Sequence, residues 1–310
     1  MKIVAFAGGV GGAKMVDGLA QCLAPSDLTV IVNNGDDFEH YGLKICPDLD
    51  TVCYTLAGLA NPETGWGRAR ETWRTLDEIK KLGGEAWFNL GDLDLATHME
   101  RTRRLQEGEP LSEITSDFCR KWGIEAAIYP MSNSPVRTFI HTRDGQRLPF
   151  QEYFVKYQFE PKITAIEFEG IGKAQVPSPA LRAIKEADAI IFCPSNPFVS
   201  LDPIIQIRAI GDAIQGKKIL AVSPLIGDRA LKGPAAKMFI EMGESPCSLN
   251  VAKHYRSYLS YFIFDNQDKE QGKAIEGWGI MCKALDILMP DRMQRKRLAG
   301  EVLAFLEKSL

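Results

Sequence analysis

The sequence predicts an α/β fold in which a parallel sheet is flanked by helices and a smaller α+β subdomain is inserted into it. Short apolar runs without charge, typical of strands buried on both faces, occur at 3–7, 28–32, 189–193 and 219–222. Patterns typical of helices lie between these runs. Strands that alternate with helices form βαβ units, which build a parallel sheet.

The composition is that of a globular protein rather than a membrane or nucleic-acid-binding one. The 310 residues are 45% hydrophobic and 25% charged, and the net charge is −3, so no broad basic surface is expected. No apolar run approaches the roughly 20 residues of a membrane span, and no signal peptide precedes the first strand. Seven scattered cysteines without a CxxC pair favour reduced thiols in a cytoplasmic protein over disulfides or a zinc site.

Four glycines follow the first strand directly, and a helix is expected after them over 13–22. Gly8, Gly9, Gly11 and Gly12 allow an anion to approach the backbone, and Lys14 adds a positive charge. The run is not a Walker A loop, and it fits GxGxxG poorly because Lys14 stands where the third glycine belongs. We predict an anion-binding turn; a tight turn that binds nothing is the alternative.

Two carboxylates follow the second strand, which spans 28–32 and ends in a polar, turn-prone stretch. Asp48 and Asp50 flank a leucine just before a helix expected over 51–59. One interpretation is that either aspartate only caps this helix. The other is a carboxylate pair that holds a divalent cation or orients a substrate hydroxyl, with Asp48 and Asp50 as catalytic residues and metal ligands.

A third polar stretch follows a charged helix expected over 68–82. A short apolar run there ends in Asn89 and Asp92, and a further helix is expected to begin at Thr97 and His98. The glycine and the paired acids of this stretch suggest another site loop. His98 could act in acid–base chemistry, although a lone histidine is more often a surface or hydrogen-bonded residue.

The middle of the chain departs from the alternation of strands and helices. A helix over 111–122 and a strand over 126–130 lead into a turn that contains Met131 and Ser132. A hairpin over 137–150 and a half-exposed strand over 163–168 follow. We therefore predict a core formed by 1–134 and 176–310, with a smaller subdomain inserted at 135–175.

The alternation resumes with a helix over 180–186. The strands at 189–193 and 219–222 end in rigid turns that contain Pro194, Ser195, Asn196 and Ser223. Uncharged turns with hydroxyl groups suit the base and sugar of a nucleotide, although ordinary βα loops are an equal alternative. We expect a helix to begin at Lys232, a last strand at 261–264 and a C-terminal helix at 291–310.

Six motifs together resemble one family. In order they are AGGVGGAK, NNGDDFEHYGLKICPDLDTV, NLGDLDLATH, YPMSNSPVRT, CPSNPFVSLDPI and AVSPLIGDRALKGPAAKM. Their order is similar to that of the 2-phospho-L-lactate transferase family, which makes the phosphodiester of the deazaflavin coenzyme F-420. The resemblance covers nearly the whole chain, from the first strand to Asp265.

The resemblance implies a Rossmann-like fold, a homodimer and a reaction that requires Mg²⁺. The donor would be the guanosine diphosphate ester of 2-phospho-L-lactate, phosphoenolpyruvate or 3-phosphoglycerate. The acceptor would be the ribityl hydroxyl of the deazaflavin Fo; GMP would leave, and the product would be F-420-0 or its dehydro form. The three donors differ by one small group, and no residue of the sequence chooses among them.

The resemblance also assigns residues. Asp50 matches an acidic position that contacts Fo, and Asn89 falls on another Fo-contact position, where some relatives carry lysine. The glycine turn with Lys14 would lie near the donor phosphates. The remaining motif residues divide between a nucleotide pocket, formed by Pro194, Ser195, Asn196 and Ser223, and other substrate contacts, assigned to Asp92, Met131 and Ser132.

Two other functions are open. A non-catalytic nucleotide-binding regulator of the same superfamily is the main alternative, although the PDLDTV and NLGDLDLATH motifs match the transferase side. An NAD(P)-dependent oxidoreductase is a weaker one. The broken GxGxxG argues against it, as do Asn33 and Asn34, which stand where an acidic residue would follow the second strand.

Overall fold

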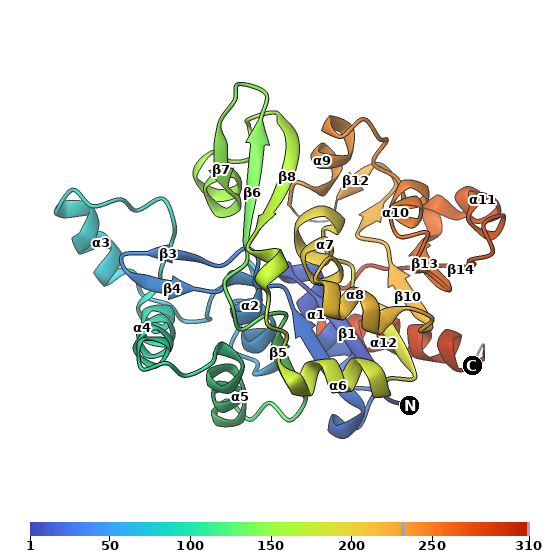
Figure 1. The fold of residues 1–310 in the computed structure, drawn as a ribbon, viewed down its shortest axis with the longest axis horizontal. Helices are drawn as coiled ribbons and strands as arrows, with labels where there is room; N and C mark the ends of the chain where they lie inside the picture. The colour runs from blue at the N-terminus through green and yellow to red at the C-terminus, as the bar shows by residue number, and fades with distance from the viewer. Residues whose placement is uncertain (231–232, 309–310) are drawn as a thin grey trace.

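The computed structural model describes residues 1–230 and 233–308. Its centre is a seven-stranded sheet in the order β14-β13-β10-β9-β1-β2-β5, in which every neighbouring pair is parallel (Figure 1). The strands are β1 (Ile3–Ala7), β2 (Leu28–Val32), β5 (Ala127–Pro130), β9 (Ala189–Phe192), β10 (Ile219–Val222), β13 (Tyr261–Asp265) and β14 (Met281–Leu285). This confirms the predicted fold class.

The order of the strands reverses at β1. From β1 the chain builds outward through β2 to β5, and it then returns to place β9 on the other side of β1. Ile3 therefore pairs with Leu28 of β2 and with Ala189 of β9. The point of reversal between β1 and β9 is where open α/β sheets bind ligands, outside the carboxyl ends of the strands.

Helices cover both faces of the sheet, because successive side chains of each strand point to opposite faces. Ile3 and Ala5 share a buried cluster with apolar residues of α1 (Gly9–Ala20), α2 (Pro47–Leu56), α5 (Leu111–Lys121) and α12 (Arg292–Glu307). Val4 and Phe6 share the other cluster with residues of α6 (Ser178–Glu186), α7 (Asp202–Ile205), α8 (Arg208–Ile214), α9 (Ala235–Glu241), α10 (Ser248–His254) and α11 (Gly272–Glu276).

A separate three-stranded antiparallel sheet projects beyond the main sheet, at the top of Figure 1. It consists of β6 (Arg137–Thr142), β7 (Arg147–Pro149) and β8 (Ile163–Glu169), in the order β7-β6-β8. The predicted hairpin and following strand are thus confirmed. The division into a core and a subdomain at 135–175 stays a prediction.

The remaining elements lie outside the two sheets. They are the helices α3 (Arg74–Lys81) and α4 (Asp92–Gln106), the hairpin β3 (Phe38–His40) with β4 (Leu43–Ile45), and the hairpin β11 (Leu225–Ile226) with β12 (Arg229–Ala230). Neither hairpin was predicted. Within the described ranges, no helix is both long and apolar enough to cross a bilayer.

Several predicted boundaries are wrong. α1 begins at Gly9 rather than Ala13, so the glycines form its first turn, and α2 begins at Pro47, where proline suits a first helical turn. α3 begins at Arg74 instead of residue 68, and α4 begins at Asp92 rather than Thr97. The strand at 261–264 is not the last, because β14 follows it as a half-exposed edge strand without an apolar run.

Two predicted helix ends fall on residues outside the described ranges. The helix expected to begin at Lys232 is one, since 231 and 232 are not described; α9 is described from Ala235. The C-terminal helix is the other: α12 ends at Glu307 and residues 309 and 310 lie outside the description.

Candidate active site

A cavity of about 870 Å³ opens at the carboxyl edge of the sheet, at the reversal between β1 and β9. The turn after β1 and the turn after β9 form one side of it. The first turns of α2, the side of α4, the segment between β7 and β8 and several loops, among them the one before α12, also line it. A volume of this size accommodates a nucleotide together with part of a second substrate.

The glycine turn and the turn after β9 interlock. The backbone N–H of Gly8 donates to Oγ of Ser195 at 3.1 Å, and the same hydroxyl donates to the carbonyl of Gly8 at 2.8 Å. A Cβ on Gly11 would lie 2.2 Å from the carbonyl oxygen of Pro194, and one on Gly12 would lie 2.6 Å from Oγ of Ser195. Side chains are therefore excluded where the two turns meet.

Asp48 fastens this turn to α2. Its Oδ1 accepts the N–H of Gly9 at 2.8 Å, and its Oδ2 accepts Nδ2 of Asn33 at 2.9 Å. The capping interpretation is wrong for this residue, because Cys46 is the N-cap of α2 and Asp48 lies inside the helix. Burial raises the pKa of Asp48 to about 6, although both hydrogen bonds favour the charged form.

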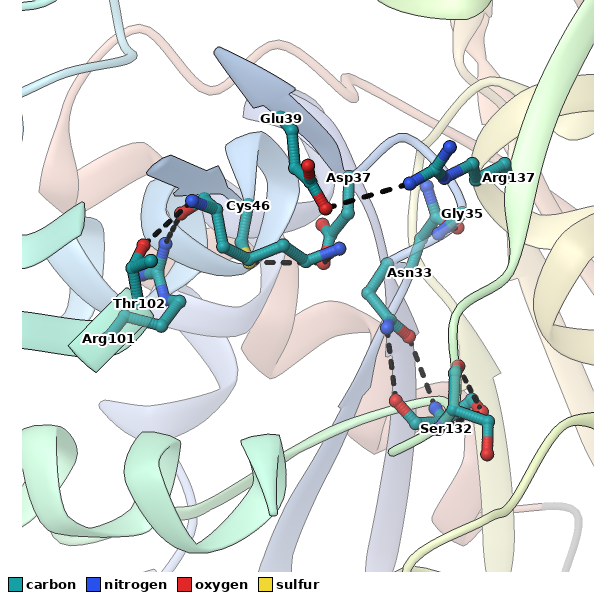
Figure 2. Close-up of polar contacts among 12 residues, drawn as sticks. Asn33, Gly35, Asp37, Glu39, Cys46, Arg101, Thr102, Ser132 and Arg137 are labelled. Atoms are coloured by element: carbon teal, nitrogen blue, oxygen red, sulfur yellow. Dashed lines mark hydrogen bonds and ion pairs between the residues drawn. The ribbon is translucent and has the colours of Figure 1, made fainter. Parts of the chain in front are cut away.

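A second buried carboxylate, Asp36, lines the cavity near Asp48. Its Oδ1 is buried and makes no hydrogen bond. Burial first, and then the charge of Asp48, raise the pKa of Asp36 well above its ordinary value. The carboxylate of the adjacent Asp37 pairs with Nζ of Lys44 at 3.3 Å and accepts a hydrogen bond from the thiol of Cys46. Figure 2 shows Asp37 beside Cys46.

Asp50 also lines the cavity, and its carboxylate is paired with the buried guanidinium of Arg101. Nη1 of Arg101 donates to its Oδ2 at 3.1 Å, and Nη2 donates to its Oδ1. Burial raises the pKa of Asp50, and the guanidinium opposes that rise. Asp50 is therefore a carboxylate with a fixed orientation and a paired charge. The capping interpretation is wrong here too, since Asp50 lies within the first turn of α2.

Two further residues of α4 line the cavity beside Asp50. Burial, with Asp50 as the next cause, raises the pKa of Asp94 to about 7, and its buried Oδ1 makes no hydrogen bond. Burial and Arg101 lower the pKa of His98 to about 2. His98 is thus a neutral part of the wall, with Nδ1 3.3 Å from Nη1 of Arg101, which matches the hydrogen-bonded alternative.

Part of the cavity wall is aromatic. Phe150, Phe154 and Phe159 come from the segment after β7, and adjacent rings stack with centroids 5.6 Å and 6.0 Å apart. Trp66 and Phe88 line the same cavity from loops that precede α3 and α4. A wall of stacked rings suits a flat aromatic ligand.

The structure brings most of the predicted site residues together. The cavity is lined by Gly8, Gly9, Gly11, Lys14, Asp48, Asp50, Asn89, Pro194, Ser195 and Asn196. Five others do not line it: Gly12, Asp92, Met131, Ser132 and Ser223.

Internal contacts occupy those five. Gly12 packs against Ser195, and Met131 is fully buried in the core. Ser223 bonds to Ser248 at 3.0 Å, and Ser132 donates to the carbonyl of Ser134. The carboxylate of Asp92 accepts the N–H of Thr75 at 3.1 Å at the start of α3. We therefore do not assign these five to substrate.

Sequence reasoning placed Asp94 in a site loop, as one of the paired acids ahead of the helix expected from Thr97, but assigned it no role, and it missed Asp36, Arg101 and the aromatic wall. Asp36 stands in the NNGDD stretch, whose position after β2 was a usable signal. Three phenylalanines within ten residues were a weaker signal for the wall. Arg101 had none, because a group of arginines such as Arg101, Arg103 and Arg104 is typical of a solvated helix face.

No group of three or more His, Cys, Asp or Glu side chains that could hold a metal occurs in the described part of the chain. Asp36 and Asp48 supply two interacting carboxylates to the cavity wall. Two carboxylates are enough only for a cation that takes its other ligands from water and substrate, as Mg²⁺ does.

The sequence matches one family of known proteins over nearly its whole length. The family model described as "2-phospho-L-lactate transferase CofD" matches residues 3–286. The chain is 39% identical over 315 residues to a phosphoenolpyruvate transferase of Streptomyces coelicolor, which covers 99% of each chain. It is 35% identical over 301 residues to a 2-phospho-L-lactate transferase of Methanosarcina mazei, which covers 97% of this chain and 99% of the relative.

A solved structure shares the fold at much lower identity. A member of the UPF0052 family from Bacillus halodurans superimposes with a TM-score of 0.65 at 13% identity, over 97% of this chain and 98% of the other. At that identity the likeness concerns the arrangement of the sheet and helices alone.

Proposed function

The chain belongs to the CofD family of 2-phospho-L-lactate transferases, and from this premise we propose that it transfers a phospholactyl-type group from a guanosine diphosphate ester to the deazaflavin Fo. The acceptor is the ribityl hydroxyl of Fo, and GMP leaves. The product is F-420-0 or its dehydro form, depending on the acid that the donor carries.

The observation that carries the proposal is that two chemically different groups of residues line one cavity. One group is the glycine turn with Lys14, which suits the donor's diphosphate. The other is the set of stacked phenylalanines, which suits the flat ring of a deazaflavin. Asp50 lines the same cavity, and its carboxylate suits the acceptor hydroxyl.

The reaction needs no protein nucleophile. The ribityl hydroxyl oxygen attacks the phosphorus that bears the lactyl-type group, and the bond from that phosphorus to the bridging oxygen breaks. GMP leaves with the bridging oxygen, and the hydroxyl proton passes to the departing phosphate or to water. In phosphoryl transfer, most catalysis comes from positioning the reactants and from stabilising charge. Asp50 accepts a hydrogen bond from the attacking hydroxyl, and Lys14 together with backbone N–H groups neutralises the phosphates.

We propose Mg²⁺ as the cofactor, held by Asp36 and Asp48. Asp36 replaces Asp50 in this role, because both oxygens of Asp50 receive N–H groups of Arg101. The unpartnered, buried Oδ1 of Asp36 fits a ligand atom. Two carboxylates beside a diphosphate would repel it, and the bound cation supplies the charge that offsets this repulsion.

For the donor we propose the enolpyruvyl ester first. Relatives named phosphoenolpyruvate transferases are 39–40% identical to this chain, whereas those named 2-phospho-L-lactate transferases are 34–35% identical. We also propose a homodimer in the cytoplasm, on the family resemblance. Light scattering at several protein concentrations tests the dimer.

The experiment is to mix the protein with Fo, Mg²⁺ and the three guanylylated donors in competition. GMP release together with a new phosphodiester of Fo supports the transferase, and the ratio of products identifies the preferred acid. Binding of the donor without turnover contradicts the proposal and favours the non-catalytic regulator. Hydride transfer from NADPH would favour an oxidoreductase instead.

A further inference from the structure

Asp50 faces the cavity, whereas Arg101, which is paired with it, does not line the cavity at all. We propose that Arg101 is a positioning residue for the acceptor: from behind the wall it holds Asp50 as a fixed anion that orients the attacking hydroxyl. The inference rests on the proposed transferase function and extends it to a residue that touches neither substrate.

The pair is buried and has two points of contact. Arg101 is only 2% exposed and Asp50 6% exposed. Nη1 and Nη2 of the guanidinium donate to different oxygens of the carboxylate. Such a two-point contact fixes both the position and the plane of a carboxylate, which a single ammonium cannot do.

The guanidinium itself is held in place. Its Nη1 also donates to the carbonyl of Lys44 at 3.3 Å and lies 3.3 Å from Nδ1 of His98. The next residue, Thr102, accepts the N–H of Lys44 at 2.8 Å and donates to the carbonyl of His98 at 2.7 Å. Figure 2 shows Arg101 and Thr102 side by side on α4, facing the segment that leads into α2 at Cys46.

This arrangement decides what Asp50 can do. Each carboxylate oxygen receives one guanidinium N–H and keeps a lone pair for another donor. The paired charge makes Asp50 a poor metal ligand, but a well-oriented acceptor for a hydroxyl. A positioning error of about 1 Å can cost roughly a hundredfold in rate, so holding the acceptor is a catalytic contribution in its own right.

The chain offers a matched control on the same helix. Arg104 also pairs with carboxylates, Glu109 and Asp117, the latter at 2.6 Å. Its side chain is 12% exposed and lies away from the cavity, against α5. Both arginines stabilise α4 through ion pairs, but only Arg101 contacts a residue of the cavity wall.

The test compares Arg101→Gln, Arg101→Lys and Arg104→Gln by steady-state kinetics, by titration of Fo and of the GDP-ester donor, and by thermal unfolding. We expect Arg101→Gln to lower kcat/KM for Fo at least about tenfold, which is about 1.4 kcal/mol. Donor affinity should change less than about twofold. Arg101→Lys keeps the charge and should recover part of the loss, while Arg104→Gln should lower the melting temperature and leave both substrate parameters unchanged.

A double variant separates positioning from folding. If Arg101→Gln does not fold, Asp50→Asn combined with Arg101→Gln removes the unpaired charge and restores an amide pair. Its kinetics should equal those of Asp50→Asn alone, because Arg101 acts only through Asp50. Additive losses would overturn the inference, as would equal losses for Fo and for the donor. If the unsubstituted chain binds Fo and donor but releases no GMP, the proposed function fails instead.

Discussion

The backbone N–H of Gly9 donates to Oδ1 of Asp48 at 2.8 Å, and this bond joins the first turn of α1 to the first turn of α2. Gly9 has a φ of +62°, in the left-handed region that glycine adopts without strain. The Asp48 carboxylate therefore lies at two helix N-termini, where negative charge is stabilised. Hydrogen bonds from two sides, with Asp48 of α2 and with Ser195 after β9, thus hold the glycine turn in one conformation.

Replacing Asp50 by Asn should lower turnover at least roughly tenfold, about 1.4 kcal/mol in the barrier. The amide keeps the shape but loses the charge that pairs with Arg101 and orients the hydroxyl. Rates at saturating Mg²⁺ and saturating substrates measure the effect. The control is Asp17→Asn, because Asp17 is 3% exposed and pairs with Arg295 at 3.2 Å outside the cavity. Equal turnover in Asp50→Asn and in the unsubstituted protein would rule out this role.

Replacing Lys14 by Ala should weaken donor binding several-fold, because Lys14 lines the cavity on the first turns of α1 and carries a positive charge near the diphosphate. Calorimetric titration of the GDP ester at low and high salt measures the affinity, and the difference should shrink at high salt. Lys2→Ala is the control, since Lys2 lies at the other end of β1 and pairs with Glu186 at 3.1 Å. Identical donor affinities in both variants would contradict the charge argument.

Replacing Gly11 by Ala should destabilise the protein by about 1–3 kcal/mol, because the new Cβ would lie 2.2 Å from the carbonyl oxygen of Pro194. Urea unfolding measures this. Gly300→Ala is the matched substitution in α12, where nothing lies within 4 Å of the new Cβ. It should stabilise the protein by roughly 0.5–1 kcal/mol. A gain of stability in Gly11→Ala like that in Gly300→Ala would show that the interlocked turns tolerate a side chain.

The unsubstituted protein should lose stability as pH rises because Asp94 ionises, and Asp94→Asn should abolish this loss. The pKa of Asp94 is about 7 in the folded chain, whereas the ordinary pKa of an aspartate is 3.8, so the folded state binds more protons than the unfolded state between these two pH values. The free energy of unfolding therefore falls as pH rises through that window, and the loss is complete above the folded pKa. Asn cannot ionise, so the variant should gain at least about 1 kcal/mol over the unsubstituted protein between about pH 5 and about pH 8.

Urea unfolding at those two pH values checks the sign. Glu71 and Asp50 raise the pKa of Asp94 and Arg101 lowers it, so both proteins must be compared with these groups intact. Asp212→Asn changes an exposed carboxylate on α8 and controls for the substitution itself. A stability difference between Asp94→Asn and the unsubstituted chain that is the same at both pH values would contradict the prediction.

The sequence was sufficient to predict six of the seven strands of the main sheet and the edge at which the cavity lies. Buried parallel strands are short apolar runs, and the residues that follow them in such a sheet meet at one edge whatever lies between. That rule alone relates Gly8, Asp48 and Pro194, which are far apart in the chain and line one cavity.

What the sequence could not predict depends on side-chain contacts across elements. A sequence motif does not distinguish residues that contact a ligand from residues that support the surrounding loops. Four motif residues make internal contacts instead of lining the cavity: Asp92, Met131, Ser132 and Ser223. Arg101 is the opposite case. Its neighbours Arg103 and Arg104 are paired with carboxylates on or near the helix surface, and only the packing of α4 against α2 distinguishes it from them.

The pairing of β1 with β9 has a consequence for synthesis on the ribosome. Gly8 and Ser195, whose hydrogen bonds lock the glycine turn, are 187 residues apart. While the first half of the chain emerges, β1 has only β2 beside it and exposes the edge that β9 will occupy. A strand with one edge unpaired is a site for association with other chains, and contacts this distant in sequence form slowly. The nascent protein therefore passes through a stage in which the glycine turn lacks its two hydrogen bonds to Ser195, and chaperone demand should be greatest at that stage.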